Sequence, residues 1–149
     1  MSLKRRGNDK SLLQGTGIAH SWNWRSALAI ILLVEDDRTS RRSIAAFLRL
    51  TGYEVYEAED GEIALNLLAS MQVDVVISDL NLPGKLNGID ILGALNALPR
   101  KIDAILITGT GSDDVRKRAK SLGATYMEKP VQLQELEQTI QQRVRRAPG

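Results

Sequence analysis

Residues 27–37 read Ala-Leu-Ala-Ile-Ile-Leu-Leu-Val-Glu-Asp-Asp, an apolar run that ends in three consecutive acids. The run is too short for a membrane-spanning helix, which needs ~20 apolar residues. A short apolar run bounded by polar residues is typical of a strand that is buried on both faces. We therefore expect a β-strand at Ile30–Val34, with Glu35 and Asp36 at its carboxyl end.

Outward from this strand, short apolar runs alternate with longer stretches of helical period. Further strands are expected at residues 53–57, 73–78, 102–107 and 125–127. Such an alternation predicts consecutive βαβ units, and hence an α/β fold with a parallel sheet of five strands. Right-handed crossovers make such a sheet doubly wound, and 2-1-3-4-5 is a common strand order.

The stretches between the strands carry helix signals. Asp60 and Ser112 are residue types that cap helix N termini, and each stands just before a helical stretch. Apolar side chains recur in these stretches at intervals of three and four, which places them on one face. In the helix after Asp60 the residues expected to face inward are Ile63, Ala64, Leu67, Leu68 and Met71.

The ends of the chain lack these patterns. Residues 1–27 contain His20, Trp22 and Trp24 but no sustained strand or helix period. We expect them to form a tail or linker, either a cloning remnant or the end of an upstream domain. The folded domain should then span residues 28–146, with a short C-terminal tail at residues 147–149.

Composition excludes several classes of protein. A length of 149 residues suits one domain with one core. The absence of cysteine excludes disulfides and thiolate metal sites and fits a reducing cytosol. The net charge is only +2, and the basic residues form no long stripe with interleaved aromatics. We therefore expect a cytoplasmic protein without membrane insertion and without direct binding of nucleic acid by this domain.

Polar side chains gather where the predicted strands end. They are Glu35 and Asp36, Asp79, Thr108 and Lys129. In an open parallel sheet, ligands bind at the carboxyl ends of the strands. Carboxylates in one partly desolvated crevice repel one another and need a cation, and oxygen ligands without His or Cys suit Mg²⁺ or Mn²⁺. A Thr and a Lys beside them complete what phosphoryl transfer to a carboxylate needs.

Four ordered segments resemble the receiver domains of response regulators in two-component signal transduction, chemotaxis regulators included. They are Ile-Leu-Leu-Val-Glu-Asp-Asp at 31–37, Val-Val-Ile-Ser-Asp-Leu-Asn-Leu-Pro-Gly at 75–84, Ile-Leu-Ile-Thr-Gly at 105–109 and Gly-Ala-Thr-Tyr-Met-Glu-Lys-Pro at 123–130. The resemblance covers about residues 28–146 and implies a flavodoxin-like (βα)5 fold with strand order 2-1-3-4-5. It also implies a phosphoprotein that receives a phosphoryl group from a sensor histidine kinase or a phosphotransfer protein.

The resemblance further implies roles for the acidic residues. Asp79 would be the phospho-acceptor and a ligand of Mg²⁺, for which Mn²⁺ could substitute. Asp36 would bind the metal directly, and Glu35 would belong to the same acidic cluster. Asn81 would contribute its backbone carbonyl to the metal.

Other residues would bind the phosphoryl group or respond to it. Lys129 would pair with a phosphoryl oxygen, and the family has a cis peptide bond between this lysine and Pro130. Thr108 would be the switch hydroxyl. Tyr126 would be the switch aromatic, moving inward when Thr108 shifts, although a half-buried strand tyrosine without a switching role is an open alternative.

Two further positions concern the lifetime of the phosphorylated form. In the family, the positions of Asn81 and Thr110 tune dephosphorylation. The sequence departs from the usual pattern in the loop at residues 83–88, which is one residue longer and has Asn87 where Asp is common. This difference leaves the expected ligands intact but makes the geometry of the loop uncertain.

Phosphorylation should bias a two-state surface made by the last two helices and the strand at 125–127. Through this surface the domain would control a downstream protein or an output domain. No output domain follows Arg146, so we expect either a stand-alone receiver or the receiver part of a larger protein. The kinase, the pathway and formation of a homodimer are left open.

Three other functions compete with this interpretation. A hydrolase of the haloacid-dehalogenase type would need a second Asp two residues after Asp79, where the sequence has Asn81. A dinucleotide-binding enzyme would need a glycine-rich loop after the first strand, where the acids stand. A degenerate receiver that only binds proteins remains an alternative. We expect no enzyme that acts on external substrates, only self-catalysed phosphotransfer and slow autodephosphorylation.

Overall fold

The computed structural model describes residues 29–146. The predicted tails at residues 1–27 and 147–149, with His20, Trp22 and Trp24, lie outside the described residues. Strands and helices alternate along the chain in the order β1 (Ile30–Val34), α4 (Arg38–Leu50), β2 (Glu54–Ala58), α5 (Gly61–Ser70), β3 (Val75–Asp79), α6 (Gly88–Asn96), β4 (Asp103–Thr108), α7 (Asp113–Ser121), β5 (Thr125–Glu128) and α8 (Leu133–Arg146).

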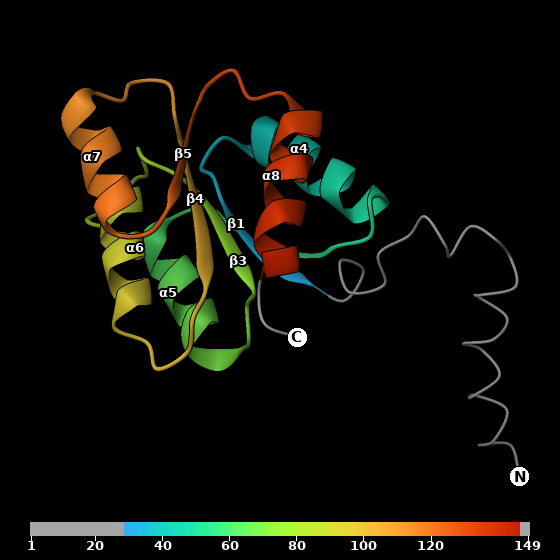
Figure 1. Ribbon diagram of the computed structural model, residues 1–149, viewed down its shortest axis with the longest axis horizontal. Helices are drawn as coiled ribbons and strands as arrows, with labels where there is room; N and C mark the ends of the chain where they lie inside the picture. Colours follow the sequence, from blue (N-terminus) through green and yellow to red (C-terminus); the bar gives the residue numbers. More distant parts are fainter. Residues whose placement is uncertain (1–28, 147–149) are drawn as a thin grey trace, which may run out of the picture.

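The strands form a single parallel sheet in the order β2-β1-β3-β4-β5. The predicted α/β fold and strand order are therefore confirmed. Helices α4 and α8 cover one face of the sheet, and α5, α6 and α7 cover the other (Figure 1). Within residues 29–146, no helix has the length and apolar character that crossing a membrane requires.

The core has two layers, one on each face of the sheet. Leu32 and Val34 of β1 belong to the cluster beneath α5, α6 and α7, whereas Ile31 and Leu33 belong to the cluster beneath α4 and α8. Successive side chains of a strand point to opposite faces, so a strand between two helical layers must be apolar at every position. This requirement explains the uninterrupted apolar run with which the sequence begins its folded part.

The register brings the strand ends together at one edge. Val34 of β1 pairs with Ser78 of β3, so the acids after β1 lie beside Asp79. Thr108 at the end of β4 pairs with Glu128, and Lys129 follows. Because all strands run in the same direction, every one of these residues reaches the carboxyl edge of the sheet.

The predicted helix starts are confirmed. The Asp60 side chain accepts a hydrogen bond from the Ile63 backbone N–H at 2.8 Å, and Ser112 accepts one from Val115 at 3.3 Å. In the loop before α6, Asn87 and Asp90 form a reciprocal capping box. Asn87, which stands where the family commonly has Asp, is therefore the N-cap of α6. It ends the loop at residues 83–88 whose geometry the sequence did not predict.

Besides shifts of one residue in the bounds of β2, β4 and β5, two details differ from the sequence prediction. Ile63 was expected to face inward, but 37% of it is exposed. The buried stripe of α5 consists of Gly61, Ala64 and Leu68, and Ile63 lies at its margin in the first turn. In the third strand, pairing begins at Val75 rather than at residue 73, and the carboxylate of Asp74 accepts a hydrogen bond from the Ile30 N–H at 2.7 Å.

Candidate functional site: an acidic crevice at the strand ends

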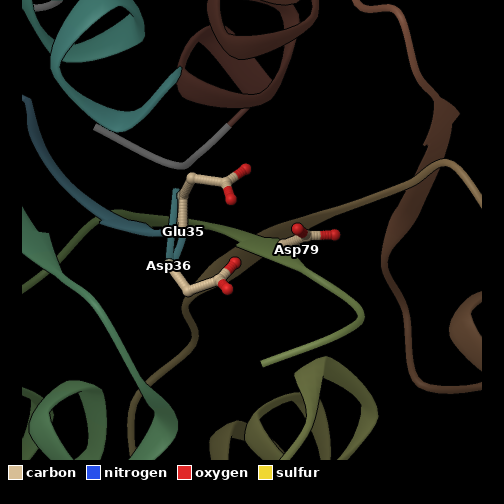
Figure 2. A group of neighbouring side chains, drawn as sticks. All are labelled: Glu35, Asp36 and Asp79. Carbon is tan, nitrogen blue, oxygen red and sulfur yellow. The ribbon is translucent and has the colours of Figure 1, made fainter. Parts of the chain in front are cut away.

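Three carboxylates meet at the carboxyl edge of the sheet. Glu35 and Asp36 follow β1, and Asp79 ends the neighbouring strand β3 (Figure 2). One oxygen from each lies within 4.8 Å of the others. Glu35 and Asp79 are buried, whereas Asp36 is exposed. The structure thus brings together the three acids that the sequence singled out, and this set of hard oxygen ligands suits Mg²⁺ or Mn²⁺.

Lys129 places its ammonium group between two of these acids. Its Nζ donates to Asp79 Oδ2 at 2.9 Å and to Glu35 Oε1 at 3.2 Å. Its backbone N–H donates to the Thr108 carbonyl at 3.0 Å, which ties the loop after β5 to the end of β4. The peptide bond from Lys129 to Pro130 is cis, as the resemblance implied. The position of Lys129 after the last strand predicted that it reaches the site, but not that it also pairs with Glu35.

Burial and the neighbouring groups of the crevice shift the pKa of two side chains. Burial raises the pKa of the Glu35 carboxyl, and the charge of Asp79 acts in the same direction. The hydrogen bonds from Asp37 and Lys129 oppose this shift without cancelling it. For Lys129, partial burial lowers the pKa, but the hydrogen bonds to Asp79 and Glu35 outweigh it and raise the pKa above its ordinary value. Lys129 therefore stays a cation in the crevice.

Asp37, the third acid of the run, is the N-cap of α4. Its side chain accepts a hydrogen bond from the Ser40 N–H at 2.8 Å and caps α4. This hydrogen bond lowers the pKa of Asp37, so the cap is an ionised carboxylate at a helix N terminus. Asp37 thus fixes the start of the helix that follows the two acids of the crevice.

A second group of side chains lies beside the acids. Thr108 is fully buried, and its Oγ1 accepts a hydrogen bond from the Thr110 N–H at 3.0 Å. Asn81 Nδ2 donates to Thr110 Oγ1 at 2.6 Å. The two positions that the resemblance connects with dephosphorylation are therefore in direct contact. The sequence identified both residues, but a contact between two separate loops has no signal in either segment.

Tyr126 points its hydroxyl into the protein. This hydroxyl is buried and has no hydrogen-bond partner among residues 29–146. It lies against Gly111, where an added Cβ would overlap it, and the Arg116 guanidinium lies 5.6 Å from the centre of the ring. The structure therefore places the expected switch aromatic inward, where a side chain at residue 111 would have to displace it.

A groove of about 560 Å³ opens beside the acids, between α4 and the start of α8. Glu35, Asp79 and Lys129 are among its lining residues. Most of its remaining wall is apolar and includes Ile44 and Val131. The sequence could not predict this groove, because its lining residues come from separate segments and the apolar ones resemble ordinary core residues.

The sequence model of the response regulator receiver domain matches residues 31–141. Among curated relatives, the cell cycle transcriptional regulator CtrA of Caulobacter vibrioides is 32% identical over 120 residues, which are 80% of this chain and 52% of that protein. A cyclic di-GMP phosphodiesterase of Thermotoga maritima is 34% identical over 105 residues, which are 70% of this chain and 28% of that protein. The chain thus spans only about half or less of these relatives.

Solved structures agree with these relatives. A CheY-like response regulator receiver domain protein from Methanospirillum hungatei has a TM-score of 0.76 at 27% identity, over 79% of this chain and 94% of that one. The five-stranded order, the acids at the strand ends and the sequence match over residues 31–141 lead to one conclusion. The chain belongs to the response regulator receiver domain family.

Proposed function

We propose that the chain is the phospho-accepting receiver of a two-component phosphorelay and that Asp79 takes the phosphoryl group. The observation that carries this proposal is the contact of Lys129 Nζ with the buried Asp79 carboxylate at 2.9 Å, within a cluster that holds two further acids. An isolated strand-end aspartate would have neither partner. Receiver domains are signalling domains, and we expect self-catalysed phosphotransfer and slow autodephosphorylation without turnover of external substrates.

Mg²⁺, or Mn²⁺ in its place, would be held by Glu35, Asp36, Asp79 and the backbone carbonyl of Asn81. The carboxylates supply hard oxygen ligands, and Lys129 alone does not balance their charge. When bound, the ion would offset the repulsion among the carboxylates and the negative charge of an incoming phosphoryl group.

The chemical step is a displacement at phosphorus. An oxygen of Asp79 would attack the phosphorus atom of a phosphohistidine on a kinase or phosphotransfer protein, so that a P–O bond forms as the donor's P–N bond breaks and the histidine nitrogen leaves. Lys129 would pair with one phosphoryl oxygen, and the Thr108 hydroxyl would turn to another. Asp79 is among the residues that line the groove between α4 and α8, which would offer the donor a route to it.

The response would be read on the face made by α7, β5 and α8. This face contains a hollow of about 420 Å³, lined in part by Arg116, Tyr126 and Glu135. Movement of Thr108 toward the phosphoryl group would change the space that Tyr126 occupies and so the shape of this face. A downstream protein or output domain would bind there, and the contact of Asn81 with Thr110 would influence how long the signal lasts.

The wider context is also a proposal. The domain would comprise residues 28–146 and work in the cytoplasm, as a stand-alone protein or as part of a longer one. The names of the two relatives, a transcriptional regulator and a phosphodiesterase, come from proteins much longer than the matched part. They therefore leave the output of this chain open.

Phosphorylation by a small phosphodonor tests the proposal. The intact mass of the wild type should increase by one phosphoryl group in the presence of Mg²⁺ and stay unchanged after chelation. Asp79→Asn should show no adduct, because the amide is not a nucleophile. Asp114→Asn is the matched control, since Asp114 is an exposed acid on α7, and it should behave like the wild type. Absence of an adduct together with absence of metal binding would contradict the proposal and leave a protein-binding module.

A further inference from the structure

The two acids after β1, Glu35 and Asp36, lie on a short turn whose backbone is hydrogen-bonded to Arg41. Arg41 Nη1 donates to the backbone carbonyl of Glu35 at 2.9 Å. The backbone N–H of Glu35 donates to the Ala58 carbonyl at 3.0 Å, so the peptide groups on both sides of Glu35 are fixed. The Asp37 N–H donates to Glu35 Oε2 at 3.0 Å. Asp36 lies between these anchored residues, and its position follows from theirs.

The orientation of Arg41 is itself fixed. Its Nε donates to Glu57 Oε1 at 3.1 Å, and only 14% of the Arg41 side chain is exposed. The second carboxylate oxygen of Glu57 lies 3.2 Å from Arg49 Nη1, and Arg49 also donates to the Val55 carbonyl at 2.7 Å. The planar guanidinium of Arg41 thus joins two acceptors at fixed angles, which a lysine ammonium could not reproduce.

The charge of Arg41 is unfavourable for binding a cation nearby. By Coulomb's law alone, a guanidinium close to the acidic cluster should weaken the binding of Mg²⁺. The effect of Arg41 on the geometry of the turn should instead strengthen the binding of Mg²⁺. Three carboxylates within 4.8 Å repel one another before the ion arrives, and an anchored turn keeps Glu35 and Asp36 in place against that repulsion. Preorganised ligands lose less conformational freedom when the ion binds.

We propose that Arg41 is a positioning residue of the metal site, which through the Glu35 carbonyl and the Glu57 carboxylate holds the acidic turn in its metal-binding geometry. This inference rests on the proposed Mg²⁺ site. It adds a residue that touches neither metal nor phosphoryl group and links the edge strand β2 to that site.

The two effects of Arg41 can be separated by the sign of the change in affinity. Mn²⁺ binding to the folded protein can be titrated by electron paramagnetic resonance, which measures the free ion and needs no phosphorylation. Arg41→Gln removes a positive charge, so charge alone predicts tighter binding, whereas positioning predicts binding about tenfold weaker. Arg41→Lys keeps the charge but loses the two-acceptor contact and should also bind more weakly than the wild type.

Arg42→Gln is the matched control. Arg42 is the exposed neighbour of Arg41 on the same helix, and its replacement removes the same charge. It should bind Mn²⁺ as tightly as the wild type or slightly more tightly. Equal weakening by Arg42→Gln and Arg41→Gln would overturn the proposal, because the effect would then not be specific to the anchored turn.

Two further outcomes separate a failure of this inference from a failure of the proposed metal site. Unchanged or tighter binding by Arg41→Gln, with wild-type binding intact, would overturn the positioning role and leave the proposed function standing. Failure of the wild type to bind Mn²⁺ would overturn the metal site and this inference together. Circular dichroism reports whether each variant folds, and if Arg41→Gln does not, Arg41→Lys is judged by the same criterion of weakened binding.

Discussion

At the scale of single residues, the site depends on one cation among buried acids. Lys129 contacts both Glu35 and Asp79, and the hydrogen bonds that it gives them keep its pKa raised despite partial burial. The sequence predicted Asp79 and Lys129 because each stands at the end of a strand. It did not predict Arg41 as an anchor, because an arginine in the first turns of a helix looks like any solvated surface residue.

Tyr126 allows a prediction at this scale. Its buried hydroxyl has no hydrogen-bond partner among the described residues, so its burial carries a desolvation cost without a compensating hydrogen bond. We expect Tyr126→Phe to raise the free energy of unfolding by about 1 kcal/mol, measured by urea denaturation. A loss of stability would contradict this prediction, because it would show that the hydroxyl makes a stabilising hydrogen bond.

Asp36 allows a second prediction at the scale of single residues. Without metal, removing one of three clustered carboxylates should relieve repulsion, so Asp36→Asn should raise the free energy of unfolding by about 0.5 kcal/mol. With Mg²⁺, the wild type should gain stability by mass action and the variant should gain less. Thermal unfolding with and without Mg²⁺ measures both effects, and Glu59→Gln, at an exposed acid, controls for net charge. Equal stabilisation of Asp36→Asn and the wild type by Mg²⁺ would contradict the role of Asp36.

At the scale of elements, the strands and the helix caps were largely predictable. The continuous apolar run of β1 and the caps at Asp60 and Ser112 are local signals, and the structure confirms them. The strand bounds differ from the predicted ones by one or two residues, and before β3 the Asp74 carboxylate accepts a hydrogen bond from the Ile30 N–H. The inward prediction for Ile63 was wrong because helical period alone does not say where the edge of a buried stripe falls.

Helix α6 contains two glycines, Gly88 and Gly93, whose replacement by alanine should change the free energy of unfolding in opposite directions. A Cβ at Gly88 would collide with the Asp79 carbonyl and lie 2.6 Å from Leu106 Cδ1, whereas nothing lies within 4 Å of a Cβ at Gly93. We expect Gly88→Ala to lower the free energy of unfolding by about 2 kcal/mol and to displace Asp79, which should also slow its phosphorylation. Gly93→Ala should raise it by about 0.5 kcal/mol. Denaturant unfolding of both variants tests the contrast, and similar effects would contradict the packing described here.

At the scale of the whole molecule, the strand order assembles the candidate site. Placing β1 beside β3 brings acids that are far apart in sequence to one edge, and placing β5 beside β4 delivers Lys129 to the same edge. The alternation of strands and helices predicted a parallel sheet, and the order could be expected from the commonness of this arrangement and from the family resemblance. The groove beside Asp79 could not be predicted from the sequence, because it exists only after α4 and α8 have packed side by side on one face.

Asp79, and no other acid of the crevice, should become phosphorylated. The most direct test is to phosphorylate the wild type with a small phosphodonor and Mg²⁺, reduce the acyl phosphate with borohydride and sequence the peptides by mass spectrometry. We predict that homoserine, the reduction product of an aspartyl phosphate, replaces the aspartate at position 79. Conversion at another acid, or at none, would contradict this account of the site.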